Sequence, residues 1–205
     1  MSIKLTKNEQ KKQKDALKQY ERYLPTLQLK KQQLQAVIRG VQVEEEKLRT
    51  ERHAKEFALT SWISLFGENP SFEKGGIESL VCPEEIKCSV GNIAGVKVPL
   101  FESITFKDVE YNPEDYPLWV DRGIEAVKEI VILRAKSTVL SRELDALSKE
   151  LRSTSQRVNL FEKVKIPETK ENIKKISVAL GDASVSAVVR GKIAKKKLSK
   201  QEVAK

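Results

Sequence analysis

The sequence predicts a mainly α-helical fold: a long antiparallel two-helix, left-handed coiled coil with a small central β-hairpin head. Three observations lead to this prediction. Two apolar series with heptad spacing lie towards opposite ends of the 205-residue chain. Proline and glycine cluster between them. Within that cluster, short runs alternate between apolar and polar residues, which is typical of strands and not of helices.

The first apolar series predicts a long N-terminal helix. Its members are separated alternately by three and four residues, which keeps one side of a helix facing a partner when two helices supercoil. Polar Lys31 and Glu45 occupy two positions of the series, where they cost stability and can fix the register. The apolar and aromatic members are Leu17, Tyr20, Leu24, Leu27, Leu34, Ile38, Val41 and Leu48.

This first helix is expected within residues 1–66. Thr6 and Glu9 have the spacing of a capping box at its start. Pro25 removes one backbone hydrogen bond and predicts a bend. Because the apolar series keeps its spacing across Pro25, we predict that the helix continues beyond it. The turn-forming residues 67–70 predict its end.

Residues 67–117 are predicted to form an irregular head with a β-hairpin. Residues 86–90 alternate between apolar and polar side chains, Val96 and Val98 flank a lysine, and residues 104–109 form a further β-like run. Because a lone hairpin is only marginally stable in water, we expect it to pack on the helices or on a partner.

The second long helix is expected over residues 118–195, followed by a basic tail over 196–205. Pro117 suits the first turn of a helix, where the missing N–H group costs no hydrogen bond. Ser137 and Thr154 are polar positions of the second seam. Its apolar members are Ile130, Leu133, Leu140, Leu144, Leu147, Leu151, Val158 and Phe161.

The second series changes its phase near Pro167. At this proline the apolar spacing resumes one position late, with Ile166 just before it and Ile173, Ile176 and Leu180 after it. A shift of this kind predicts a local change in the supercoil.

Net charge is +9, and basic residues gather near both ends. One interpretation is that they keep exposed helix ends soluble; another is that they attract an acidic partner surface. Nucleic acid is a weaker hypothesis, because no aromatic residue interleaves with the basic residues. The C-terminal cluster considered for partner binding is Arg190, Lys192, Lys195, Lys196 and Lys197.

No catalytic, metal or cofactor site is predicted. His53, the only histidine, lies in a charged helical stretch, and Cys82 and Cys88 have no histidine near them that would suggest zinc. The chain has no phosphate-binding P-loop motif, and the glutamates at 44–46 are interpreted as a solvated face. Without a signal-like or membrane-length apolar run, we expect a cytoplasmic protein with reduced thiols.

Several segments resemble the D-type stalk proteins of V-type ATPases. Residues 92–99, NIAGVKVP, resemble the central N-(I/V)-x-G-V-x-(I/V)-P segment of that family. Residues 4–7 and 24–30 resemble the N-terminal helix of a bacterial branch, and residues 116–121 its second helix start. Residues 157–167, RVNLFEKVKIP, resemble the RVNALE…IP signature of the C-terminal helix, with Arg157, Val158, Asn159, Ile166 and Pro167 as the matching positions.

The resemblance implies a central-stalk rotor shaft. Two antiparallel helices would enter a hexamer of three A and three B subunits, with the basic cluster near the tip. The lower part would meet the F subunit and the component that links the stalk to the membrane rotor ring. Such a non-catalytic subunit couples ATP synthesis or hydrolysis to proton or sodium translocation by rotation. It is peripheral to the membrane, without membrane insertion and without nucleic acid. The alternative hypothesis is a coiled-coil tethering or nucleic-acid-associated adaptor.

Overall fold

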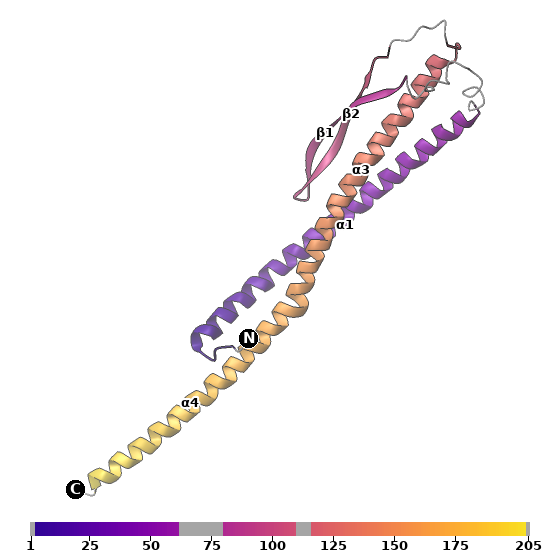
Figure 1. The fold of residues 1–205 in the computed structure, drawn as a ribbon. Coiled ribbons are helices and arrows are strands. Elements are labelled where there is room, and N and C mark those ends of the chain that lie inside the picture. Colours follow the sequence, from indigo (N-terminus) through magenta and orange to yellow (C-terminus); the bar gives the residue numbers. More distant parts are fainter. Residues whose placement is uncertain (1–2, 62–79, 110–115, 204–205) are drawn as a thin grey trace. The chain divides into compact units, whose positions relative to one another are not determined.

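The computed structural model describes residues 3–61, 80–109 and 116–203, with backbone only from 198 onwards. Figure 1 shows the order of its elements, and the helices with one antiparallel hairpin confirm the predicted fold class. The elements are helix α1 (Lys7–Thr60), strands β1 (Cys82–Ile93) and β2 (Val96–Lys107), helix α3 (Val120–Leu160), π-helix η4 (Phe161–Lys165) and helix α4 (Ile166–Val203).

The chain divides into two compact units, which we describe separately. The middle unit comprises residues 31–153, and the terminal unit comprises residues 1–30 together with 154–205.

Helix α1 begins where the cap was predicted. The backbone N–H of Glu9 donates a hydrogen bond to the Thr6 hydroxyl at 3.3 Å, and the N–H of Gln10 bonds the Thr6 carbonyl at 3.0 Å. The helix runs through Pro25, as predicted. One residue later the Thr26 hydroxyl donates to the Tyr23 carbonyl at 2.7 Å. The predicted helix end at 67–70 lies outside the described residues.

In the middle unit, helices α1 and α3 pack antiparallel. Leu34 and Leu147 are fully buried in one cluster with Ile38 and Val41. Further along α1, Lys55 pairs with Glu129 of α3 at 2.8 Å. Later residues of α1 therefore contact earlier residues of α3, so the two helices run antiparallel as predicted.

The hairpin reverses through a two-residue turn. Ala94 and Gly95 both have positive φ, 51° and 80°, as a type I′ turn requires. Glycine meets this requirement without steric cost. The strands pair from Ile93 with Val96 outwards, and β2 places Val98 in the helix cluster at 1% exposure. The hairpin therefore packs on the helices, as expected for a pair of strands that is marginal alone.

The terminal unit pairs residues 7–30 of α1 with the C-terminal helices. The rings of Tyr20 and Phe161 stack with centroids 5.3 Å apart, and Glu21 pairs with Lys170 at 3.2 Å. Val158 and Ile176 are buried at 4% and 0% exposure. Aromatic and aliphatic contacts, and not the exposed ion pair, supply most of its stability.

The π-helix η4 accounts for the phase shift in the second apolar series. The backbone N–H of Ile166 bonds the carbonyl of Phe161, five residues back, whereas an α-helix bonds four residues back. This turn takes up one additional residue. After it, Thr169 and Ile176 are buried, one position later than the earlier heptad spacing would place them.

Two predicted boundaries differ from those of the structure. Helix α3 begins at Val120 and not at 118, because Pro117 lies in a preceding turn in which the Val120 N–H bonds the Pro117 carbonyl. Helix α4 runs through Gly181 and Gly191 to Val203, so the expected tail at 196–205 begins inside a helix. The division of the chain into the four predicted segments as domains stays a prediction.

Candidate functional site

Every residue predicted for the two seams is buried or partly buried. In the middle unit the seam brings Leu34 and Leu147 together with the half-buried Leu140 and Leu144. In the terminal unit Thr154, a polar seam position, is 2% exposed. These side chains hold the helices together. Their assignment to a coiled-coil seam with a role in the assembly stays a prediction.

The residues of the family-like motif divide between the inside and the surface. Val158 is buried and Ile166 is partly buried, whereas Arg157, Asn159 and Pro167 are exposed. The π-helix lies between the two parts of the motif. The inward residues therefore support helix pairing, and the outward residues are accessible to another molecule.

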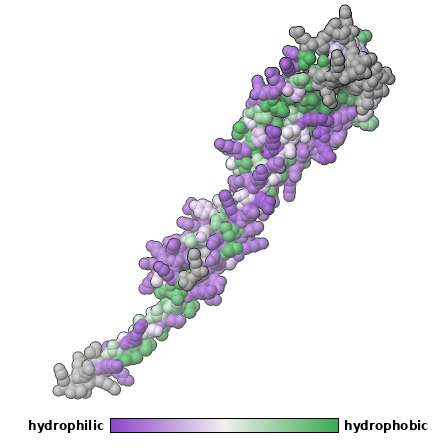
Figure 2. Space-filling model, in the orientation of Figure 1, coloured by the Kyte–Doolittle hydropathy of each residue, from purple (hydrophilic) through white to green (hydrophobic). Residues whose placement is uncertain are grey.

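The last part of α4 carries an exposed apolar surface, which we call the C-terminal stripe. Its members are 48–64% exposed, although each has a side chain that usually packs in a core. Figure 2 shows hydrophobic side chains along this end of α4, beside hydrophilic ones. The C-terminal stripe consists of Val178, Val185, Val188, Val189 and Ile193.

The C-terminal stripe does not continue the seam of the terminal unit. At about 100° per residue, Val185 and Val189 lie roughly opposite Ile176 and Leu180 on the helix. The face that continues the seam carries small residues instead, including Ala183 and Ala187. The apolar surface of α4 therefore changes sides along the helix.

The predicted basic cluster lies in the same segment of α4. Its five side chains are all exposed, and Arg190 Nε donates to the Ser186 carbonyl at 3.2 Å. Their spacing distributes them around the helix and not along one face. Such an arrangement presents positive charge in several directions, which suits a surrounding surface better than a flat one.

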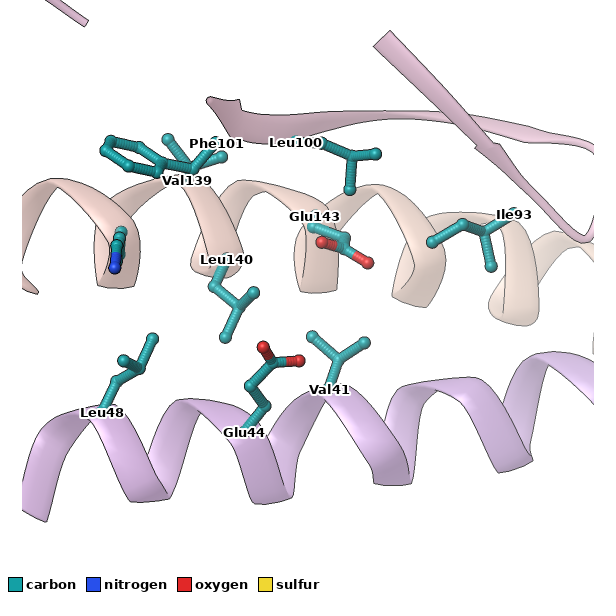
Figure 3. A pocket seen from close by; sticks show the side chains of 10 residues that line it. Val41, Glu44, Leu48, Ile93, Leu100, Phe101, Val139, Leu140 and Glu143 are labelled. Atoms are coloured by element: carbon teal, nitrogen blue, oxygen red, sulfur yellow. The ribbon is translucent and has the colours of Figure 1, made fainter. Parts of the chain in front are cut away.

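A groove in the middle unit lies between the hairpin and helices α1 and α3 (Figure 3). Its volume is about 600 Å³. Most of its walls are apolar, and its charged members are Glu44, Lys136 and Glu143. The lining residues are Val41, Glu44, Leu48, Ile93, Leu100, Phe101, Lys136, Val139, Leu140 and Glu143.

Glu143 is the unusual member of this groove. The residue is 4% exposed, and burial, followed by the charge of Glu44, raises the pKa of its carboxyl above the ordinary 4.5. Figure 3 shows Glu143 on α3 and Glu44 on the facing side of α1. The Lys136 ammonium lies over the Phe101 ring, 5.8 Å from its centroid.

Sequence reasoning missed this pair of carboxylates. The glutamates at 44–46 are expected on a solvated face, and Glu44 is indeed exposed, but it also borders the groove. Glu143 lies four residues after Val139 and four before Leu147, so it shares the inward side of α3. That spacing was the available signal.

Within the described ranges, no three His, Cys, Asp or Glu side chains are grouped so that they could hold a metal ion. Over the same residues, no helix combines the length and apolar character that a membrane span needs.

Comparison with known families identifies the chain. A family model described as the D subunit of ATP synthase matches residues 9–196. The chain belongs to this family. The resemblance found in the sequence is therefore confirmed, and it extends over both helices and the hairpin.

Bacterial relatives give the same result over nearly the whole chain. The V-type ATP synthase D subunit of Borreliella burgdorferi is 47% identical over 199 residues, covering 97% of this chain and 96% of that protein. The protein of the same name from Chlamydia trachomatis serovar L2 is 36% identical over 205 residues, covering 98% of each chain. That from Chlamydia caviae is 36% identical over 201 residues, covering 98% and 95%.

Proposed function

We propose that this chain is the central rotor shaft of a V-type ATP synthase. It couples ATP synthesis or hydrolysis in a hexamer of three A and three B subunits to proton or sodium translocation by rotation. The chain itself is non-catalytic. It lies on the cytoplasmic side, peripheral to the membrane, as part of the complex. Membership of the ATP synthase D-subunit family supports this proposal.

The C-terminal stripe is the structural observation that carries the proposal. A helix that pairs within its own chain buries its apolar face, but Val185 is 64% exposed and Val189 is 48% exposed. Apolar residues on the side of α4 away from the seam favour contact with a different molecule. A hexamer that encloses this segment would cover them, and the basic cluster around the same helix would meet acidic groups of the enclosing wall.

The hairpin is the proposed contact of the lower partners, which are the F subunit and the component linking the stalk to the rotor ring. Strand β1 carries Ile86 at 45% exposure and Val90 at 74% exposure. A register shift between Lys87 and Cys88 separates the two residues, so each is an exposed apolar side chain in its own part of the strand. These side chains supply apolar contacts in addition to the packing of Val98 on the helices.

Reconstitution tests the proposal. The chain is co-expressed with the A and B subunits of its own organism, and copurification and ATP-driven rotation of an attached bead are measured. A chain that ends after Leu180 lacks most of the C-terminal stripe and the basic cluster. It should assemble less well and transmit less torque, while some coupled hydrolysis remains. A chain that ends after Lys197 is the matched control. Failure of the full chain to copurify with A and B subunits would overturn the proposal.

A further inference from the structure

We propose that the groove of the middle unit receives an arginine side chain from a partner protein, with the guanidinium between the carboxylates of Glu44 and Glu143. The identification of that partner as another component of the ATP synthase rests on the proposed function. The chemistry of the groove does not, and it can be tested on this chain alone.

Glu143 is a polar group that the chain does not satisfy by itself. It is 4% exposed, and none of the hydrogen bonds or ion pairs among the described residues involves it. The charge that acts on it is the like charge of Glu44. Among the described residues, the only buried polar side-chain atom without a hydrogen bond is Arg52 Nε, so the Glu143 oxygens still reach the water in the groove. A carboxylate that only water satisfies is open to a cationic ligand.

The groove lacks one positive charge for neutrality. Helix α1 contributes Glu44, helix α3 contributes Lys136 and Glu143, and the lining residues of the strands are apolar. With both carboxylates ionised, two negative charges and one positive charge leave the groove with a net charge of −1. The ammonium of Lys136 is engaged over the face of Phe101. A single additional cation would neutralise the groove.

The shape and walls of the groove favour arginine. Apolar side chains such as Val41 and Leu140 can pack along the methylene stem of a long cation. The planar guanidinium has five donors in a fixed fork, which lets it bridge two carboxylates. A divalent metal ion is less suitable, because Ca²⁺ takes about six to eight oxygen ligands. The lining offers carboxylates from only Glu44 and Glu143.

The effect of replacing Glu143 on the stability of the isolated chain distinguishes a binding role from a structural role. Glutamine has nearly the same shape but no charge, so Glu143→Gln should leave the isolated chain at least as stable as the wild type. A purely structural glutamate would lose stability on this change. A residue that weakens the free chain but strengthens a complex is what a partner site requires.

The first experiment tests the groove on the full chain without any partner. n-Butylguanidinium chloride is titrated into protein with ¹³C-labelled glutamate, and the carboxyl carbons are followed by NMR. The Glu44 and Glu143 resonances should shift saturably, and n-butylurea, a neutral probe of similar shape, should leave them unchanged. Glu143→Gln should abolish the response of Glu44, whereas Asp145→Asn, an exposed change on the same helix, should preserve it. Absence of a saturable shift, or equal shifts with n-butylurea, would overturn the proposal.

The second experiment tests the partner. The full chain is co-expressed with the other subunits of its ATP synthase, and their retention is measured for Glu143→Gln and Glu44→Gln. One of these partners should bind roughly 30-fold more weakly, because loss of one member of a buried charge pair commonly has at least this effect. Asp145→Asn and the exposed change Glu46→Gln are the matched controls. Equal affinity of all the partners for Glu143→Gln and wild type would overturn the partner assignment.

The two experiments separate this inference from the proposed function. If the wild-type chain binds no other component of the ATP synthase, the proposed function and the partner assignment both fail. The guanidinium titration then still decides whether the groove is a cation site.

Discussion

The core of the middle unit and the C-terminal stripe are built from the same kinds of residue but have opposite exposures. Leu34 and Leu147 are 0% exposed, whereas Val185 and Val189 are 64% and 48% exposed. Each set lies along one side of a helix. The residue type therefore does not decide burial; the presence of a second element within reach does.

The difference indicates two uses for apolar side chains in one chain. In the middle unit, helix α3 and the hairpin cover the apolar side of α1, and the buried area stabilises the fold. On α4, the stripe lies roughly opposite the face that carries Ile176, which is buried. Substitutions in the core of the middle unit should therefore lower stability, whereas substitutions in the C-terminal stripe should weaken assembly.

The largest effect is expected for Leu34→Asp. Loss of the buried side chain and introduction of an unpaired charge should lower the free energy of unfolding by roughly 3–5 kcal/mol. Leu144→Asp, at a partly buried position, should have a smaller effect in the same direction. Urea unfolding followed by circular dichroism measures both. If Val185→Asp, the exposed counterpart, were equally destabilising, the distinction between the two regions would be wrong.

Val185→Asp should instead weaken assembly. In the isolated chain it should change the free energy of unfolding by less than about 0.5 kcal/mol, as is usual for exposed positions. In the presence of the A and B subunits, affinity should fall roughly tenfold, because burying one valine is worth about 1.5 kcal/mol. Titration of the labelled chain with hexamer measures this change. Lys163→Asp, exposed on η4 and outside the stripe, serves as the comparison, and equal losses for both variants would remove the special role of the stripe.

Glu143→Gln should give a stability difference that depends on pH. In the folded chain the pKa of the Glu143 carboxyl is raised above 4.5, by burial first and then by Glu44. The folded state therefore holds this proton more tightly than the unfolded state does. The stabilisation that this proton contributes is fully present below the unfolded pKa, and it is lost as the pH rises through the folded pKa.

Because glutamine does not ionise, the variant should escape this loss. Its free energy of unfolding should equal that of the wild type at about pH 4 and exceed it at neutral pH. Urea unfolding at a series of pH values measures the difference, with Asp145→Asn as control. A difference that stayed constant with pH would show that Glu143 does not carry the titration.

The smallest effect is expected from the basic cluster. Changing all five residues to glutamine should leave the stability of the isolated chain unchanged, because exposed charge pairs contribute about 0–1 kcal/mol each. Assembly with the A and B subunits should weaken most at low salt, where screening is least. Binding at two salt concentrations measures this. Loss of duplex DNA binding together with unchanged assembly would favour the adaptor hypothesis instead.

Much of the fold could be predicted from the sequence, because local spacing is a property of the chain itself. The heptad series predicted the helix pair, and alternation between Gly and Pro clusters predicted the hairpin. The cap at Thr6 and the passage of the helix through Pro25 are also local features. Even the π-helix has a signature, since the apolar series resumes one residue late at Ile166.

The tertiary structure decided the features that depend on distant residues. The sequence shows a one-residue offset, but the hydrogen bond from Ile166 to Phe161 shows how the helix absorbs it. Glu143 resembles any surface glutamate until the hairpin and α1 cover it. The C-terminal stripe resembles a core segment until residues 181–197 of α4 are seen to be exposed on every side of the helix. Periodicity fixes which side chains share a face, whereas burial and charge depend on what packs against that face.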